Sequence, residues 1–468
     1  MRVLIIGAGK LGYKLASQLS FGGTLVTVMD SDSQVLEHIS DHLDVMLIKG
    51  SGMHIEILEE LGIHEYDLVI AVTKSDETNI VISSIAKRLG CKKSIARVRN
   101  PEYSTQSGFI KKTMDIDYII NPELATANEI NRNLLYHYSL YSGDFAEGRI
   151  MMLHFAASDL PGFVGKKIRE IKNINGILIG IISRGGEIII PHGDNQIMED
   201  DIVYVIGKKD NINQLAKMCK TSVQVKYIKR VMILGGGRIG YYLAKKLISQ
   251  GISVKIVEKD KGRCEYLSEN LDDILVICGD GTDINLLDEE DIASMDAFVG
   301  VTGHDEENLL MTLMAKHSGI KKAIAKVSKP NYIQVIEKLG IDVAVSPIDI
   351  TASDILKYIR GGRVASVSLL LGGRAEVTEI IADKDMWFIG KPISDLSLPK
   401  GIIIGALEHK GEIIIPIGST IIYPGDRFVL LSSETEQKSL EEFFSSFKGG
   451  LFSELRNRNK AGRKNSNS

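Results

Sequence analysis

Two glycine-rich segments of the sequence have the spacing of a loop that binds nucleotide phosphates. Each follows a short apolar run, and each has the pattern G-x-G-x-x-G. In such a loop the first glycine permits a tight turn, the second lets the backbone approach a pyrophosphate, and the third lets the following helix pack closely on the strand. The unpaired N–H groups at the start of that helix then bind phosphate. The residues expected to contact a nucleotide here are Gly7, Gly9, Lys10, Leu11 and Gly12 in the first segment, and Gly235, Gly237, Arg238, Ile239 and Gly240 in the second.

An acidic residue follows each glycine motif at the distance expected of a ribose-binding carboxylate. Asp30 follows Gly12 and Glu258 follows Gly240 at the same spacing, which is close to that of the acid in known dinucleotide-binding motifs. A carboxylate at the end of this strand accepts hydrogen bonds from the ribose hydroxyls and repels a 2′-phosphate. This favours NAD(H), or an adenosine nucleotide such as ATP or ADP, over NADP(H). The alternative is that each acid only caps the helix that follows it, and the complete motif favours ribose binding.

Further candidates follow the later strands of each predicted sheet. Ligands of open α/β sheets bind outside the carboxyl ends of the strands, so polar residues at these ends are expected to line the crevice. Arg97 could reach a phosphate there, but a solvated surface cation is an equally good interpretation of it. Ser51 stands where the second half has an acid, so the two pockets cannot be equivalent. The candidates of this group are Gly50, Ser51, Thr73 and Arg97 in the first half, and Asp280, Gly281, Thr282, Thr302 and Lys326 in the second.

The elements that must position these residues occur twice along the chain. The first glycine motif begins at Gly7 and the second at Gly235. Matching segments follow at nearly the same shift, such as Asp76-Glu77-Thr78-Asn79 and Asp305-Glu306-Glu307-Asn308. A later pair, at 185–191 and 410–416, also repeats. The order is therefore large unit, small unit, large unit, small unit.

The pattern within each unit predicts its class. Each large unit alternates short Val, Ile and Leu runs with amphipathic helical stretches, which is typical of a parallel sheet covered on both faces. The small units contain short apolar runs separated by turn residues, which indicates a mainly β domain. We therefore predict an α/β protein with two Rossmann-like, doubly wound parallel-sheet domains, each followed by a small β-rich α+β domain. The predicted bounds are 1–140, 141–225, 226–361 and 362–448, followed by a basic and disordered tail at 449–468.

The composition excludes several classes of protein. The 468 residues include 44% hydrophobic and 25% charged residues and have a net charge of −4, so the chain is globular and has no field that attracts nucleic acid. The four cysteines form no C-x-x-C pair, so neither a disulfide framework nor a zinc site is indicated. No apolar run reaches about 20 residues, the length of a membrane span. We expect a cytoplasmic protein with no nucleic-acid partner and no indicated metal site.

No catalytic residues are indicated, so we do not expect an enzyme. A dehydrogenase needs a second domain that holds a substrate beside the nicotinamide, with a general acid or base in reach. The small units are short for that purpose, and their histidines at 154, 192 and 409 do not repeat at equivalent positions. Two alternatives stay open: an NAD-dependent oxidoreductase with a duplicated cofactor domain, and a nucleotide-sensing transcription regulator. For the second, the sequence shows no helix-turn-helix with a basic face.

Along essentially its whole length the chain resembles the TrkA family, the cytoplasmic regulatory subunits of Trk potassium-uptake systems. The matching features are the duplicated glycine motif with Asp30 and Glu258, and the order of a nucleotide-binding RCK (or KTN) unit and a small TrkA-C unit, twice. The resemblance implies a protein that binds NAD(H) and adenine nucleotides to gate a membrane potassium-transporter subunit of the Trk type.

The same resemblance implies how such a protein assembles. The chain would form a ring-like homo-oligomer, a dimer or a tetramer, peripheral at the inner face of the cell membrane. The helix around 123–140 resembles the crossover helix through which the domains of this family pair. Ser51 departs from the family's glycine-acid-glycine segment, which leaves the nucleotide preference of the first half open.

Overall fold

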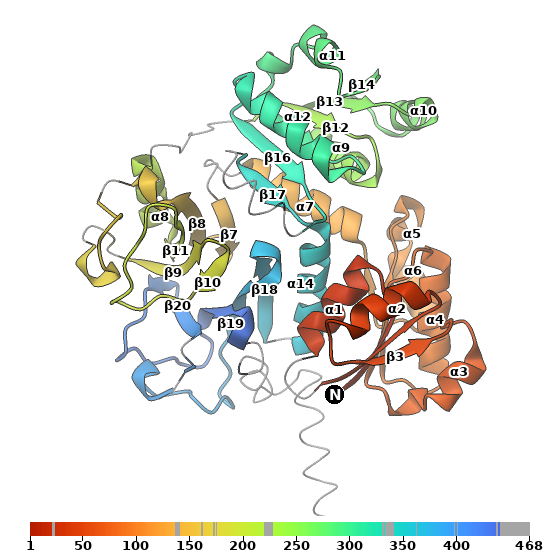
Figure 1. Cartoon of the computed structure of the whole chain (residues 1–468), viewed down its shortest axis with the longest axis horizontal. Helices are drawn as coiled ribbons and strands as arrows, with labels where there is room; N and C mark the ends of the chain where they lie inside the picture. The colour runs from red at the N-terminus through yellow and green to blue at the C-terminus, as the bar shows by residue number, and fades with distance from the viewer. Residues whose placement is uncertain are drawn as a thin grey trace, which may run out of the picture.

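Four sheets organise the part of the chain that the computed structural model describes (Figure 1). Two of them are parallel with six strands each, and two are antiparallel with five strands each. The predicted α/β class is therefore confirmed. The predicted domain bounds near 140, 226 and 362 and the predicted basic tail lie outside the described residues, so they stay predictions. The described residues are 1–20, 24–135, 141–160, 162–171, 174, 176–219, 228–329, 332, 341–361, 363–396, 398–399, 401–436 and 439.

The first parallel sheet is built from alternating strands and helices. Its elements are β1 (Arg2–Ile6), α1 (Lys10–Leu19), β2 (Leu25–Asp30), α2 (Ser33–Ser40), β3 (Met46–Lys49), α3 (Ile55–Glu60), β4 (Leu68–Ala71), α4 (Asp76–Arg88), β5 (Lys93–Arg97), α5 (Pro101–Thr105), α6 (Ser107–Thr113), β6 (Tyr118–Ile120) and α7 (Pro122–Leu135). The strand order is β3-β2-β1-β4-β5-β6. The order reverses between β1 and β4, and the loop after β1 lies at this switch point, where ligands of such sheets bind.

The second parallel sheet repeats this arrangement. Its elements are β12 (Arg230–Leu234), α9 (Arg238–Ser249), β13 (Ser253–Glu258), α10 (Lys261–Asn270), β14 (Ile274–Cys278), α11 (Ile284–Glu289), β15 (Ala297–Gly300), α12 (Asp305–His317), β16 (Lys322–Lys326), β17 (Val343–Val345) and α14 (Pro347–Arg360). The strand order is β14-β13-β12-β15-β16-β17. The sequence repeat thus produces two sheets of the same topology.

Each small unit forms one antiparallel sheet. The first contains β7 (Tyr141–Phe145), β8 (Ile150–Ala156), β9 (Ile177–Arg184), β10 (Glu187–Ile189), β11 (Ile202–Lys208) and α8 (Lys209–Met218), and the second contains β18 (Val364–Leu370), β19 (Ala375–Ile381), β20 (Ile402–His409), β21 (Glu412–Ile414) and β22 (Arg427–Ser433). The two sheets share one apolar core, in which Ile181 and Ile206 of the first unit pack with Val377 and Leu431 of the second. The small units therefore form a joined pair.

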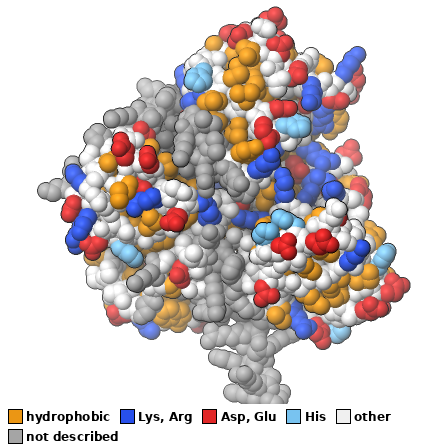
Figure 2. Space-filling model, viewed as in Figure 1, with side chains coloured by type: hydrophobic (Ala, Val, Ile, Leu, Met, Phe, Trp, Pro, Cys, Tyr) orange, Lys and Arg blue, Asp and Glu red, His pale blue; other side chains and the backbone are white. Residues whose placement is uncertain are grey.

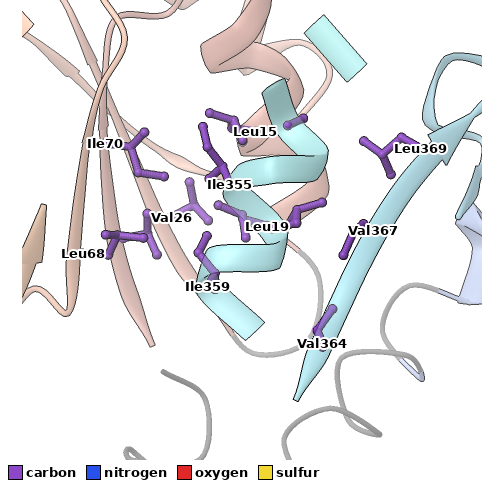
Figure 3. Close-up of a cluster of buried hydrophobic side chains, with 14 of the residues drawn as sticks. Leu15, Leu19, Val26, Leu68, Ile70, Ile355, Ile359, Val364, Val367 and Leu369 are labelled. Carbon is purple, nitrogen blue, oxygen red and sulfur yellow. The ribbon is translucent and has the colours of Figure 1, made fainter. Parts of the chain in front are cut away.

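The helices α7 and α14 each complete the sheet of the other half. Buried residues of α14 belong to the core of the first sheet, where Ile355 and Ile359 lie against Leu15 and Leu19 of α1 (Figure 3). On the other side, Ile130 and the rest of the buried face of α7 belong to the core of the second sheet and pack with α9. Each half therefore covers one face of its sheet with a helix that the other half supplies.

A buried ion pair fixes the second small unit to α14. The Arg360 guanidinium donates to both carboxylate oxygens of Glu376 on β19, and each side chain is only 3% exposed. In the first half the corresponding positions hold Leu135 and Met151, which cannot form such a pair. The second small unit is therefore tied to its helix by a contact that the first unit lacks.

The exchange of helices predicts that a substitution in one half destabilises the other. Leu356 on α14 is 1% exposed within the core of the first sheet. We expect Leu356→Ala to lower the free energy of unfolding by about 2–5 kcal/mol, because the lost contacts leave a cavity. Hydrogen exchange should speed up in β1 and β2, although these strands lie near the opposite end of the sequence.

A matched control is Leu310→Ala on α12, where the leucine is 58% exposed. This variant should stay within about 0.5 kcal/mol of the parent in denaturant unfolding. If Leu356→Ala accelerated exchange only within the second half, the exchanged helix would not stabilise the first sheet.

Candidate functional site

The two glycine loops have the geometry of phosphate-binding turns. Gly7 has a φ of +106°, and a Cβ on it would stand 2.8 Å from the Thr73 nitrogen. A Cβ on Gly12 would stand 1.9 Å from the Gly7 carbonyl oxygen, so no larger residue fits between helix and strand. A Cβ on Gly9 would meet nothing within 4 Å, so this face of the loop is open to a ligand. The second loop has the same geometry: Gly235 has a φ of +106°, a Cβ on Gly237 would meet nothing within 4 Å, and a Cβ on Gly240 would stand 2.1 Å from the Gly235 carbonyl oxygen.

The two predicted ribose acids lie beside these loops and do not cap the following helices. The Asp30 carboxylate accepts from the nitrogens of Ala8 at 2.7 Å and Asp32 at 3.0 Å. Glu258 accepts from the nitrogen of Gly236 at 2.7 Å and from that of Asp260 at 2.9 Å. The caps are the side chains of Asp32 and Asp260, which accept from the first turns of α2 and α10. The capping interpretation of Asp30 and Glu258 is therefore wrong.

The loops after the third strands differ between the halves. In the second half the Asp280 carboxylate accepts from the Thr282 nitrogen at 2.9 Å and hydroxyl at 2.7 Å. These bonds, first the one from the backbone and then the one from the side chain, lower the pKa of Asp280. In the first half Ser51 only accepts from the Met53 nitrogen at 3.3 Å. One pocket therefore has a carboxylate at a place where the other has a neutral hydroxyl.

A buried asparagine in each half positions the ends of the fourth and fifth strands. Asn79, which is fully buried, accepts from the nitrogen and hydroxyl of Thr73 and donates to the carbonyl oxygens of Thr73 and Arg97. Asn308 makes the corresponding backbone bonds to Thr302 and Lys326. These asparagines were not among the predicted site residues, although the repeated Asp-Glu-x-Asn segments are a sequence signal that could have identified them.

Arg97 and Lys326 occupy matching positions but have different surroundings. The Arg97 Nε is buried without a hydrogen-bond partner among the described residues. Arg97 is half-buried with its Nε enclosed, so it is not a fully solvated surface cation. Burial, followed by repulsion from Arg99, lowers the pKa of Arg97. Lys326 instead donates to the Thr302 carbonyl at 3.0 Å and pairs with Asp305 at 3.3 Å. Of these two residues, Arg97 has a buried side-chain nitrogen without a hydrogen-bond partner among the described residues, whereas the Lys326 ammonium is paired.

A residue of the second half lies at the crevice of the first. Arg238, at the start of α9, is close enough to affect the pKa values of Arg97 and of Glu123 on α7. Burial raises the pKa of Glu123, and its Oε2 has no partner within the described chain. Basic side chains gather on the surface where the two parallel-sheet domains meet (Figure 2). Arg238, from the second half, therefore lies near Arg97 and Glu123 of the first half.

Two hydrogen bonds hold α9 against α7 at this boundary. Asn121, just before α7, donates to the Tyr242 hydroxyl at 3.0 Å, and Lys246 donates to Asn128 at 2.6 Å. The helix that begins at the second glycine loop is therefore attached to the chain that follows the last strand of the first sheet.

The structure also describes a cavity between the small units, four cysteines, and no candidate metal site or membrane span among the described residues. A cavity of about 510 Å³ lies between the small units and is lined by charges of both signs, among them Arg149, Lys208 and Glu412. The cysteines at 91, 219, 264 and 278 are free thiols. Within the described ranges no group of three or more His, Cys, Asp or Glu residues could hold a metal ion, and no helix is long and apolar enough to cross a membrane.

Family models and curated proteins match this chain over most of its length. The TrkA-N domain model matches residues 3–122 and 231–347, and the TrkA-C domain model matches residues 156–220 and 377–445. The Trk system potassium uptake protein TrkA homolog 1 of Methanosarcina mazei is 37% identical, covering 95% of this chain and 100% of the relative. The Trk system potassium uptake protein TrkA of Haemophilus influenzae is 34% identical, covering 95% and 98%.

Solved structures share the fold at lower identity. The crystal structure of the GsuK RCK domain has a TM-score of 0.55 at 18% identity, and covers 95% of both chains. The GsuK channel bound to NAD has a TM-score of 0.54 at 19% identity, and covers 95% of this chain and 79% of that one. The tandem arrangement of parallel-sheet and small units is therefore a known architecture.

The hydrogen bonds that Asn79 donates to the carbonyl oxygens of Thr73 and Arg97 predict how the stability of an Asn79 variant depends on pH. In Asn79→Asp, an ionised carboxylate would face two carbonyl oxygens and leave them without a donor. We expect the free energy of unfolding at neutral pH to fall by about 2 kcal/mol or more. The loss should shrink as the pH is lowered, because a protonated carboxyl group can again donate. Denaturant unfolding at several pH values measures this.

The control is Asn285→Asp, an exposed asparagine in the first turn of α11, which should cost almost nothing. A pH-independent loss at position 79 would contradict the role assigned to the amide donor.

Proposed function

Because the chain belongs to the TrkA family of Trk system potassium uptake proteins, we propose that it is the regulatory subunit of a potassium-uptake transporter. It binds an adenine nucleotide at each glycine loop and controls transport through a change of conformation. The observation that carries this proposal is the pairing, in both halves, of an open glycine turn with a carboxylate fixed beside it.

The fixed carboxylates favour NAD(H), with ATP or ADP as further ligands of the same class. Both oxygens of Asp30 and of Glu258 already accept one backbone N–H each, which sets their orientation before a ligand arrives. Their remaining lone pairs suit the two hydroxyls of an unphosphorylated ribose. One structure with this fold, the GsuK channel, is named as bound to NAD. The glycines and the predicted residues around them form the binding surface of each half.

The exchanged helices explain how a nucleotide could change the shape of the protein. A ligand shifts a conformational equilibrium only by its different affinity for the two states. The helix α9, which begins at the second glycine loop, is held to α7 by the Lys246–Asn128 hydrogen bond and to the residue before α7 by the Asn121–Tyr242 hydrogen bond. Closing one crevice therefore moves a helix of the other half, and the Arg360–Glu376 pair passes the motion of α14 to the second small unit.

We propose a place and partners that agree with this role. The curated relatives are named as Trk system potassium uptake proteins rather than as enzymes. The chain would act in the cytoplasm, peripheral at the inner face of the cell membrane, as a dimer or tetramer bound to a Trk-type transporter subunit. Nucleic acid has no part in this function.

Calorimetry with NAD+, NADH, ATP and ADP tests nucleotide binding by the purified protein. We expect Asp30→Ala to weaken the site of the first half and Glu258→Ala that of the second, each by about tenfold or more, because a charge-assisted hydrogen bond is lost. Asp44→Ala, which removes an exposed carboxylate outside the crevice, is the matched control and should bind as the parent does.

No heat of binding from the parent protein would refute the nucleotide proposal. Steady consumption of NADH with a pool of small substrates would instead support the oxidoreductase alternative.

Potassium flux tests the regulatory role. The protein is added to vesicles that contain its transporter subunit, and uptake is measured with and without each nucleotide. We expect the nucleotide to change uptake with the parent protein, and the double variant Asp30→Ala/Glu258→Ala to abolish that dependence. Uptake that is the same with and without the protein would contradict the proposal.

A further inference from the structure

The two glycine loops are held in different ways. In both halves a carboxylate accepts from the N–H of the residue between the first two glycines, Ala8 or Gly236. In the second half Arg263 also binds this loop from the other side. Its Nε donates to the Gly236 carbonyl at 2.6 Å, and its Nη2 donates to the Gly237 carbonyl at 3.3 Å. The corresponding residue of the first half is Val35, which has no polar atom to donate.

The guanidinium of Arg263 is part of a stack. Its central carbon lies 4.4 Å from the ring centre of Tyr266 and 5.9 Å from that of Tyr241. One face of the planar group is therefore against an aromatic ring, and two of its nitrogens point at the glycine loop. The corresponding pair in the first half is His38 and Tyr13, whose rings lie 5.9 Å apart without an arginine over them.

The position of Arg263 relative to Glu258 indicates which part of a nucleotide it meets. Gly236 is bound by Glu258 through its nitrogen and by Arg263 through its oxygen. A ribose held by Glu258 therefore lies within a few ångströms of the guanidinium. A base attached to that ribose would lie near the start of α10, which carries Arg263, and the loop after β14, which carries Asp280 and Thr282.

We propose that Arg263 is the platform on which the adenine base stacks in the second half, and that this makes the second half the more selective purine site. The inference rests on the proposed binding of nucleotides at the glycine loops. A guanidinium fixed at its edge by two carbonyl oxygens presents a flat surface, and the face that is not against Tyr266 suits a purine ring. The first half has Val35 in place of Arg263, and its side chain has no planar group, so we expect binding there to depend more on the ribose and phosphates.

The chemistry of the loop argues for stacking rather than for a contact with a 2′-phosphate. The Glu258 carboxylate stands at the ribose and would repel a second anion there. Two of the Arg263 nitrogens already donate to carbonyl oxygens of the loop. Stacking of a base on the face of the guanidinium requires no further hydrogen bond. Loss of the stacking contact between a base and the guanidinium is expected to weaken binding by about tenfold.

The test uses the full-length Asp30→Ala protein, so that calorimetry reports mainly the second half. In this background we expect Arg263→Ala to weaken ADP and NAD+ by about tenfold, and Arg263→Lys to weaken them almost as much, because the charge stays but the plane is lost. Nicotinamide mononucleotide, which has no adenine, should respond to neither substitution. Lys261→Ala removes an exposed cation from the first turn of the same helix and is the matched control.

The outcomes separate the possible roles of this residue. Unchanged binding in Arg263→Ala, or full binding in Arg263→Lys, would overturn the stacking platform while leaving nucleotide binding intact. NADP+ binding tighter than NAD+ binding, and lost in Arg263→Ala, would assign the arginine to a 2′-phosphate and overturn it too. No binding of any nucleotide by the Asp30→Ala protein would refute the proposed site of the second half and the inference with it. Equal melting temperatures show that the variants are folded.

Discussion

The burial of α7 and α14 against the sheet of the opposite half is the constraint on which the rest of the structure depends. A parallel sheet of buried strands needs apolar cover on both faces. Here one face of each sheet is completed by residues such as Ile130 and Ile355 that belong to the other repeat. Each parallel-sheet domain is therefore packed against a helix of the neighbouring repeat. The hydrogen bond between Lys246 of α9 and Asn128 of α7 belongs to the same packing.

The duplicated sequence has produced two sites of one topology and different chemistry. The backbone geometry at Gly7 and Gly235 is the same, and the bridging asparagines make the same backbone bonds. The differences lie in side chains that do not affect the fold, such as Ser51 against Asp280 and Val35 against Arg263. The two repeats therefore have the same backbone fold, while their pockets differ in charge. This is the pattern expected if the halves bind different ligands or bind one ligand with different strength.

Local features could be predicted from the sequence, and long-range partners could not. The glycine turns and the apolar strands depend on residues that are close in the chain, so motif and periodicity identify them. The amphipathic pattern of α14 predicts a buried face but not which sheet buries it. Lys326 matched Arg97 in position, and only the structure shows that Asp305 binds it. The role of Asn79 depends on two strand ends that meet only after folding.

The Arg360–Glu376 pair has a consequence for how the protein responds to salt. Both side chains are 3% exposed, so mobile ions cannot approach them, and their attraction is almost independent of ionic strength. Pairs at the edge of the small units, such as Arg427–Glu147, are open to solvent and weaken as salt rises. A protein proposed to regulate potassium uptake works where the ion concentration changes. The Arg360–Glu376 ion pair would hold α14 to the second small unit equally well across that range of salt concentration, while the exposed ion pairs of the small units weaken.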